Sequence, residues 1–99
     1  DIAVIRQGIR FPFTAHVVVG ETIPGTTLVY MGDHELGAEF GGFDAGDYPY
    51  RKVGDSVVWE GNLRSDIAVE YSLRVLYYDD QRAQVGGMVT VAAPVSGGR

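Results

Sequence analysis

Residues 66–80 read DIAVEYSLRVLYYDD, and this stretch decides the fold class. Large apolar side chains occupy every second position, and Ala, Glu, Ser and Arg stand between them. Such alternation is typical of a β-strand with one dry face and one wet face. Because the strand would greatly exceed the usual five or six residues, we expect it to be the spine of a sheet or to bend at a barrel corner. The dry positions are Ile67, Val69, Tyr71, Leu73, Val75 and Tyr77.

Residues 56–63 form a second strand of the same kind, joined to the first through residues 64–66. A three-residue connection sets the register of this hairpin. In that register Trp59 lies opposite Tyr71, and the apolar faces of the two strands coincide. The same register sets Glu60 across from Glu70 on the wet face, where Arg64, Arg74 or a basic group of a partner would neutralise them. Two further pairs follow from it: Val57 with Leu73, and Leu63 with Ile67.

A third strand is expected at residues 83–93. A two-residue turn at residues 80–81 would set Leu73 against Met88 and mix the two faces. Either an odd-length loop or a bulge at Gly86–Gly87 restores the match, since glycine pairs inside strands often mark bulges. These registers predict a core led by Trp59, Tyr71, Leu73, Val75, Val89 and Val91.

The rest of the chain is less regular. Strands are predicted at residues 2–9, 14–19 and 26–31, with a turn at 20–25 that could make a hairpin of the last two. Gly8 and Pro12 suggest that the first strand is broken or lies at a sheet edge. Residues 32–55 are glycine-rich and acidic, and we expect short strands at 39–43 and 50–53 around a turn at 44–49. The alternative is a functional loop lying over the sandwich.

These patterns predict six to eight strands and no amphipathic helix. The expected fold is all-β, an antiparallel β-sandwich of immunoglobulin-like or related topology, with a small β-barrel as the alternative. Residues 1–94 would form a single domain, and residues 95–99 a flexible C-terminal tail.

Composition excludes several classes of function. The chain of 99 residues has no cysteine and a formal net charge of −5, and its eight basic residues form no run. Disulfides, thiolate metal sites and a nucleic-acid-binding surface are therefore not expected. No apolar stretch reaches the length of a transmembrane segment. The chain begins at Asp1 rather than Met, so we expect an exported, extracytoplasmic or secreted product, although a piece of a longer protein fits as well.

Residues 32–55 hold two candidate ligand sites. Tyr48 and Tyr50, on either side of Pro49, could stack against a carbohydrate or another small ligand if their rings were exposed and coplanar. Asp44 and Asp47 have the spacing of a turn and are the candidate ligands of a calcium ion. A solvated acidic loop is the favoured interpretation of the carboxylates, and no cofactor is expected.

No motif for catalysis is found. His16 and His34 are the only histidines, and a hydrolytic triad would need one of them beside a serine or carboxylate in a cleft. We therefore expect a protein that is not an enzyme.

Leu76, Tyr78 and Met88 form the candidate partner-binding patch, because strict alternation places them on the face that should be wet. Apolar patches on such faces usually mark contact surfaces. The sequence thus predicts a non-enzymatic β-sandwich that acts through protein–protein contact. It would be an accessory or structural subunit, a homo-oligomer or a module of an extracytoplasmic protein. The alternative is a carbohydrate- or small-ligand-binding module that uses residues 32–55.

Overall fold

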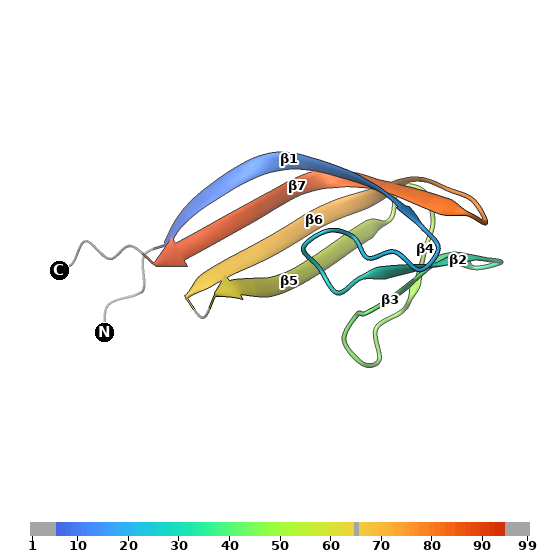
Figure 1. Cartoon of the computed structure of the whole chain (residues 1–99), viewed down its shortest axis with the longest axis horizontal. Coiled ribbons are helices and arrows are strands. Elements are labelled where there is room, and N and C mark those ends of the chain that lie inside the picture. The colour runs from blue at the N-terminus through green and yellow to red at the C-terminus, as the bar shows by residue number, and fades with distance from the viewer. Residues whose placement is uncertain (1–5, 65, 95–99) are drawn as a thin grey trace.

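The computed structural model describes residues 6–64 and 66–94, which form seven strands in two antiparallel sheets (Figure 1). One sheet has the order β1-β7-β6-β5 and the other the order β2-β3-β4. The predicted antiparallel β-sandwich is therefore confirmed, and the described strands do not close into a barrel. The strands are β1 (Arg6–Val18), β2 (Val29–His34), β3 (Gly37–Gly41), β4 (Tyr50–Arg51), β5 (Ser56–Arg64), β6 (Ile67–Tyr78) and β7 (Arg82–Pro94).

The distribution of the strands between the two sheets differs from that of immunoglobulin domains. Immunoglobulin domains place the first, second, fourth and fifth strands in one sheet. Here the large sheet is a meander of β5, β6 and β7 with β1 added beside β7. No part of the described chain is helical, so it contains no helix long and apolar enough to cross a membrane. The predicted tail at residues 95–99 lies outside the described residues.

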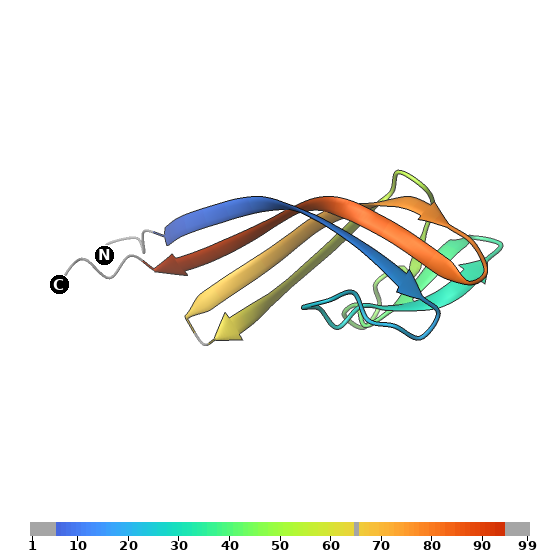
Figure 2. The ribbon, with the colours of Figure 1, turned by 45° about the horizontal axis from the view of Figure 1, so that its top comes forward.

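The two sheets have unequal lengths, and the small one covers only one end of the large one (Figures 1 and 2). In both views β2, β3 and β4 lie beneath the end of the large sheet at which β6 turns into β7. The other end of that sheet extends beyond them, and the molecule measures 53 × 27 × 20 Å. We call the face of the large sheet that looks toward β2–β4 the inner face.

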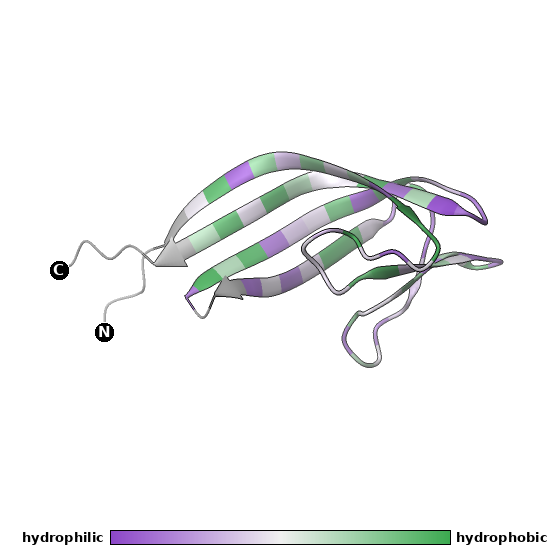
Figure 3. Ribbon diagram, viewed as in Figure 1, coloured by the Kyte–Doolittle hydropathy of each residue, from purple (hydrophilic) through white to green (hydrophobic). Residues whose placement is uncertain are grey.

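The register of β5 and β6 agrees with the sequence prediction at their centre. Trp59 pairs with Tyr71, Val57 with Leu73, and Glu60 with Glu70. The prediction that Leu63 meets Ile67 is wrong, because the ladder is irregular after Asn62 and Ile67 pairs with Arg64 instead. Alternating bands of hydropathy along the large sheet show the two-faced pattern (Figure 3).

A bulge in β6 aligns this strand with β7. Tyr78 pairs with Ala83, as a tight turn at residues 80–81 requires, yet Val75 pairs with Val85. Leu76 is therefore the extra residue, and the shift brings Leu73 opposite Gly87 instead of Met88. The predicted bulge exists, but it lies on the other strand from Gly86–Gly87, and an odd-length loop is not used.

Of the two predictions for the first strand, that it is broken or that it lies at a sheet edge, the second is confirmed: the strand is continuous and lies at the edge of the large sheet. β1 runs along β7 through Pro12, which pairs with Met88. Proline is tolerated there because β1 is an edge strand, whose outward-facing backbone groups need no partner in the sheet. The expected hairpin of residues 14–19 and 26–31 does not form, since β1 and β2 belong to different sheets.

Residues 32–55 contain the two short strands that were expected. β3 begins and ends two residues before the predicted 39–43, and β4 covers only the first two residues of the predicted 50–53. β3 pairs with β2 on one side and with β4 on the other, so the segment builds the small sheet. The predicted turn at 44–49 falls between β3 and β4, and the amide of Asp47 donates to the carbonyl of Asp44.

The connection between β1 and β2 covers the middle of the inner face. Ile23 and Leu28 are fully buried there. Between them the amide of Thr26 donates to the carbonyl of Ile23, closing a turn with Pro24 and Gly25 at its centre. Gly25 has φ +84°, as the second central residue of a type II turn requires.

The core lies between the two sheets at the covered end. The predicted residues Tyr71, Leu73, Val75 and Val89 are buried, whereas Trp59 and Val91 are only partly buried at its margin. The prediction that Tyr77 is a core residue is wrong, because it lies beyond the bulge and is 44% exposed. The remaining buried residues are Val17, Ile23, Leu28, Tyr30, Ala38, Phe40, Val57, Val69, Ala83 and Val85.

Candidate functional site

The predicted patch of Leu76, Tyr78 and Met88 does not form as a unit. Tyr78 is partly buried and packs against the core, because the bulge at Leu76 reverses the alternation after Val75. Leu76 is 47% exposed, and Met88, opposite Ser72, is partly buried. A Cβ at Gly86 would lie only 2.9 Å from Leu76 Cδ1, so glycine leaves the space that this bulged side chain occupies. Two of the three residues therefore remain on the outer face.

A larger apolar surface lies at the end of the inner face that the small sheet does not cover. Ile9 is 67% exposed and Phe11 is 40% exposed, although both lie on the same face as buried Val17. Val91, which pairs with Ile9, and Ile67 are partly buried. We call this surface, made of Ile9, Phe11, Ile67 and Val91, the open end of the inner face. In Figures 1 and 2 no described strand of the small sheet reaches it.

Sequence reasoning missed this surface because it treated residues 2–9 and 14–19 as separate strands. The signal was present, since every odd position from Ile9 to Val17 is apolar. Period-two alternation over nine residues is strong evidence for one strand. Pro12 stands at an even position, where it interrupts neither the pattern nor the pairing with β7.

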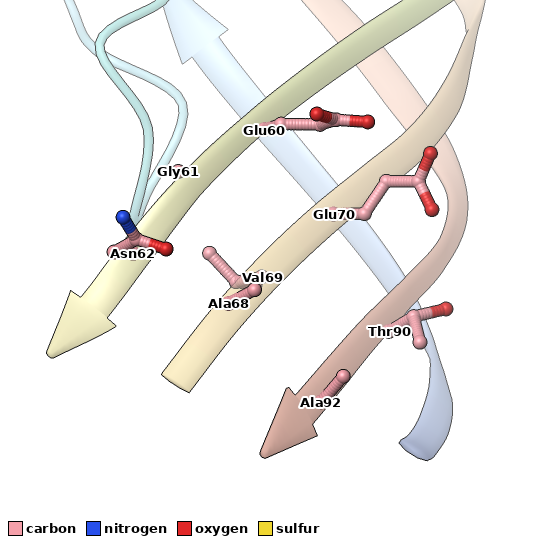
Figure 4. A pocket seen from close by; sticks show the side chains of 8 residues that line it. All are labelled: Glu60, Gly61, Asn62, Ala68, Val69, Glu70, Thr90 and Ala92. Atoms are coloured by element: carbon pink, nitrogen blue, oxygen red, sulfur yellow. The ribbon is translucent and has the colours of Figure 1, made fainter. Parts of the chain in front are cut away.

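The outer face of the large sheet carries a hollow of about 460 Å³ (Figure 4). Its floor includes Ala68 and Ala92, which pair across β6 and β7. Glu60 and Glu70 stand opposite each other at one side, and their carboxylates point the same way. Among the side chains that the structure describes, the only ion pair is Arg82 with Asp79, so no described side chain neutralises either glutamate. The side chain of Arg64, which was expected as a counter-charge, lies outside the described part of the chain.

The described basic side chains that could have neutralised this pair bond elsewhere or lie farther off. Arg74 donates to the carbonyl of Gly54. Arg10 is in the same row as Glu70, but Thr90 of β7 stands between them. The hollow is thus a small, negatively charged depression with a floor of small side chains.

The tyrosines of residues 32–55 do not form a flat platform. Tyr48 is 59% exposed, but its ring meets that of Tyr50 edge-on, at 5.4 Å and 77°. Tyr50 in turn stacks on His34 at 4.5 Å. The condition for a stacking platform, two exposed and coplanar rings, is not met, since one face of Tyr50 is already occupied and the Tyr48 ring lies nearly perpendicular to it.

Arg51 organises this corner of the molecule. Its guanidinium donates to the carbonyls of Tyr48, Tyr50 and Ser56 and lies over the ring of Phe43 at 4.5 Å. The loop between β3 and β4 is therefore tied to the start of β5. These contacts hold the loop in place. They also occupy the guanidinium group that a ligand at this corner would otherwise contact.

Asp44 and Asp47 are both exposed and line a second hollow of about 320 Å³ together with Trp59 and Glu60. Among residues 6–64 and 66–94, no three His, Cys, Asp or Glu side chains are grouped so that they could hold a metal ion. Asp44 and Asp47 can supply at most four carboxylate oxygens, so carbonyl groups or water would have to complete the six to eight oxygens that calcium takes.

The two histidines occupy unrelated places. His16 is exposed on β1 opposite Gln84. His34 closes the β2–β3 turn, where its Nδ1 accepts from the amide of Leu36. Each histidine thus has a local structural setting, and the structure does not bring the two together.

The pKa values of Tyr30 in β2 and of Asp79 in the β6–β7 turn are shifted. Burial, followed by the nearby carboxylates of Asp33 and Asp79, raises the pKa of Tyr30 to about 12. The Tyr30 hydroxyl donates to the carbonyl of Asp79, joining the small sheet to this turn. The pKa of Asp79 is lowered, because its carboxylate accepts hydrogen bonds from the Gln81 amide, the Tyr77 hydroxyl and the Arg82 amide. These groups fasten the turn to the sandwich.

Comparison with known proteins leaves the fold and the geometry as the basis for function. No family model, no curated protein and no solved structure matches this chain.

Proposed function

We propose that this protein is a non-enzymatic β-sandwich that acts through contact with another protein chain. It would serve as an accessory or structural subunit, or as a module of an extracytoplasmic protein. The observation that supports the proposal is the open end of the inner face, where Ile9 and Phe11 are exposed beside the core. Contiguous apolar surface of this kind is typical of interaction sites.

The physical reason is the cost of leaving this surface in water. Each large apolar side chain that passes from water into a contact gains roughly 1.5–3 kcal/mol when it is fully buried. Phe11 offers a flat, rigid ring of the type that anchors interfaces. A partner that lies against β1 and β7 would continue the second layer of the sandwich along the part of the large sheet that β2–β4 leave bare.

Site-specific photo-crosslinking in the cells that produce the protein tests the proposal. A photoreactive phenylalanine analogue is placed at position 11 and, as a matched control, at Ser72, which is exposed on the outer face. We expect a discrete cross-linked product from position 11, either with a second copy or with one partner, and none from position 72. Analytical ultracentrifugation across a concentration series identifies the case of self-association.

A second set of variants checks that the apolar surface itself makes the contact. Ile9→Glu combined with Phe11→Glu should abolish the product, while Leu76→Glu, which changes a similarly exposed side chain on the outer face, should leave it unchanged. Equal cross-linking from positions 11 and 72, or no product from either, would overturn the proposal. Circular dichroism confirms that each variant is folded.

The alternative, a carbohydrate- or small-ligand-binding module, is supported by the exposed ring of Tyr48 alone. One ring can stack on one sugar, so binding would be weak and confined to this ring. Titration with a panel of oligosaccharides, followed through amide shifts in NMR spectra, would show perturbations around Tyr48 that vanish in Tyr48→Ala. Unchanged spectra throughout the panel would remove this alternative.

A further inference from the structure

We draw no further inference here: the strongest candidate, the hollow on the outer face of the large sheet between Glu60 and Glu70, rests on an opposed pair of carboxylates, and nothing in the described residues shows what would bind between them.

Discussion

At the scale of single residues, the contact between Gly25 and Tyr71 couples a loop to the core. A Cβ at Gly25 would lie 2.0 Å from the Tyr71 hydroxyl oxygen, and Gly25 also has a positive φ. Tyr71 itself meets the rings of Phe13 and Trp59 edge-on, at 5.3 and 5.7 Å, so it has little room to move away. The connection between β1 and β2 can cover the inner face only because residue 25 has no side chain.

We therefore predict that Gly25→Ala destabilises the fold by clearly more than the roughly 1 kcal/mol expected from a positive φ alone. Gly20→Ala is the matched control, because Gly20 has φ +92° and nothing within 4 Å of a Cβ. Urea denaturation measures both free energies of unfolding. In a Tyr71→Phe background, which removes the clashing oxygen, the excess cost of Gly25→Ala should shrink. Equal costs for the two glycines would show that the contact does not matter.

Tyr30 gives a prediction for alkaline pH. Its pKa is raised to about 12 in the folded protein, whereas the unfolded chain titrates near 10. Between these values the folded state binds more protons than the unfolded state, so stability falls as pH rises. The full stabilisation is present below pH 10, and about 2–3 kcal/mol would be lost on the way to pH 12. Urea melts between pH 9 and pH 12 measure this slope.

Tyr30→Phe is the control, because it keeps the ring and removes the titrating hydroxyl. The variant should be less stable by roughly 1 kcal/mol at neutral pH, through loss of the hydrogen bond to the Asp79 carbonyl, and its stability should vary less between pH 10 and pH 12. A slope identical to that of the unaltered protein would assign the alkaline loss of stability to other groups.

At the scale of the elements, the pairing of β5 with β6 places two like charges opposite each other. No side chain that the structure describes, a set that leaves out that of Arg64, neutralises Glu60 or Glu70. Like charges directly opposite on adjacent strands are destabilising, by up to ~1 kcal/mol. Because both side chains are exposed, salt should screen most of the repulsion.

We predict that Glu60→Gln and Glu70→Gln each stabilise the protein by roughly 0.2–1 kcal/mol at low ionic strength. The double variant should gain little beyond either single one, since the repulsion can be relieved only once. Thermal and urea melts at low and high salt measure these differences. Glu35→Gln, in the exposed β2–β3 turn, controls for the change in net charge. Additive gains would mean that the two carboxylates do not interact.

The elements also show how far sequence reasoning reached. The centre of the β5–β6 ladder was predictable because the dry faces of residues 57–59 and 71–73 match in one register only. The position of the bulge was not, since either strand of a hairpin can carry the extra residue. The position of the bulge also determined which residues of the candidate patch lie on the outer face. Because Leu76 is the extra residue, Tyr78 and not Tyr77 faces the core.

The sequence also did not predict which of the two sheets each strand joins. The sequence indicated short strands in residues 32–55, but no local pattern says which sheet a strand joins. Tyr30 consequently appears in the core without having been expected there, with its ring centroid 5.5 Å from that of Phe40. The open end of the inner face also depends on this placement, because it is defined by where the small sheet stops.

At the scale of the whole molecule, the partial cover of the large sheet implies uneven local stability. Val85 and Val91 are both the fourth residue from an end of β7. Both face inward, and each pairs with β6 on one side and β1 on the other. Their surroundings differ in burial: Val85 is fully buried, and Val91 lies at the open end. The two positions therefore have the same backbone pairing, but the second layer of the sandwich covers Val85 and does not cover Val91.

We predict that the Val91 amide exchanges with solvent at least roughly tenfold faster than the Val85 amide in native-state hydrogen exchange. Regions with few buried apolar contacts open locally, whereas the covered end should open only with global unfolding. Phe11→Ala should lower the protection of Val91 further and leave that of Val85 almost unchanged, since Phe11 is part of the open end. NMR-detected exchange measures both amides in one sample. Equal protection of the two valines would mean that the large sheet is stable without a second layer, and it would remove the physical reason for a partner to cover its open end.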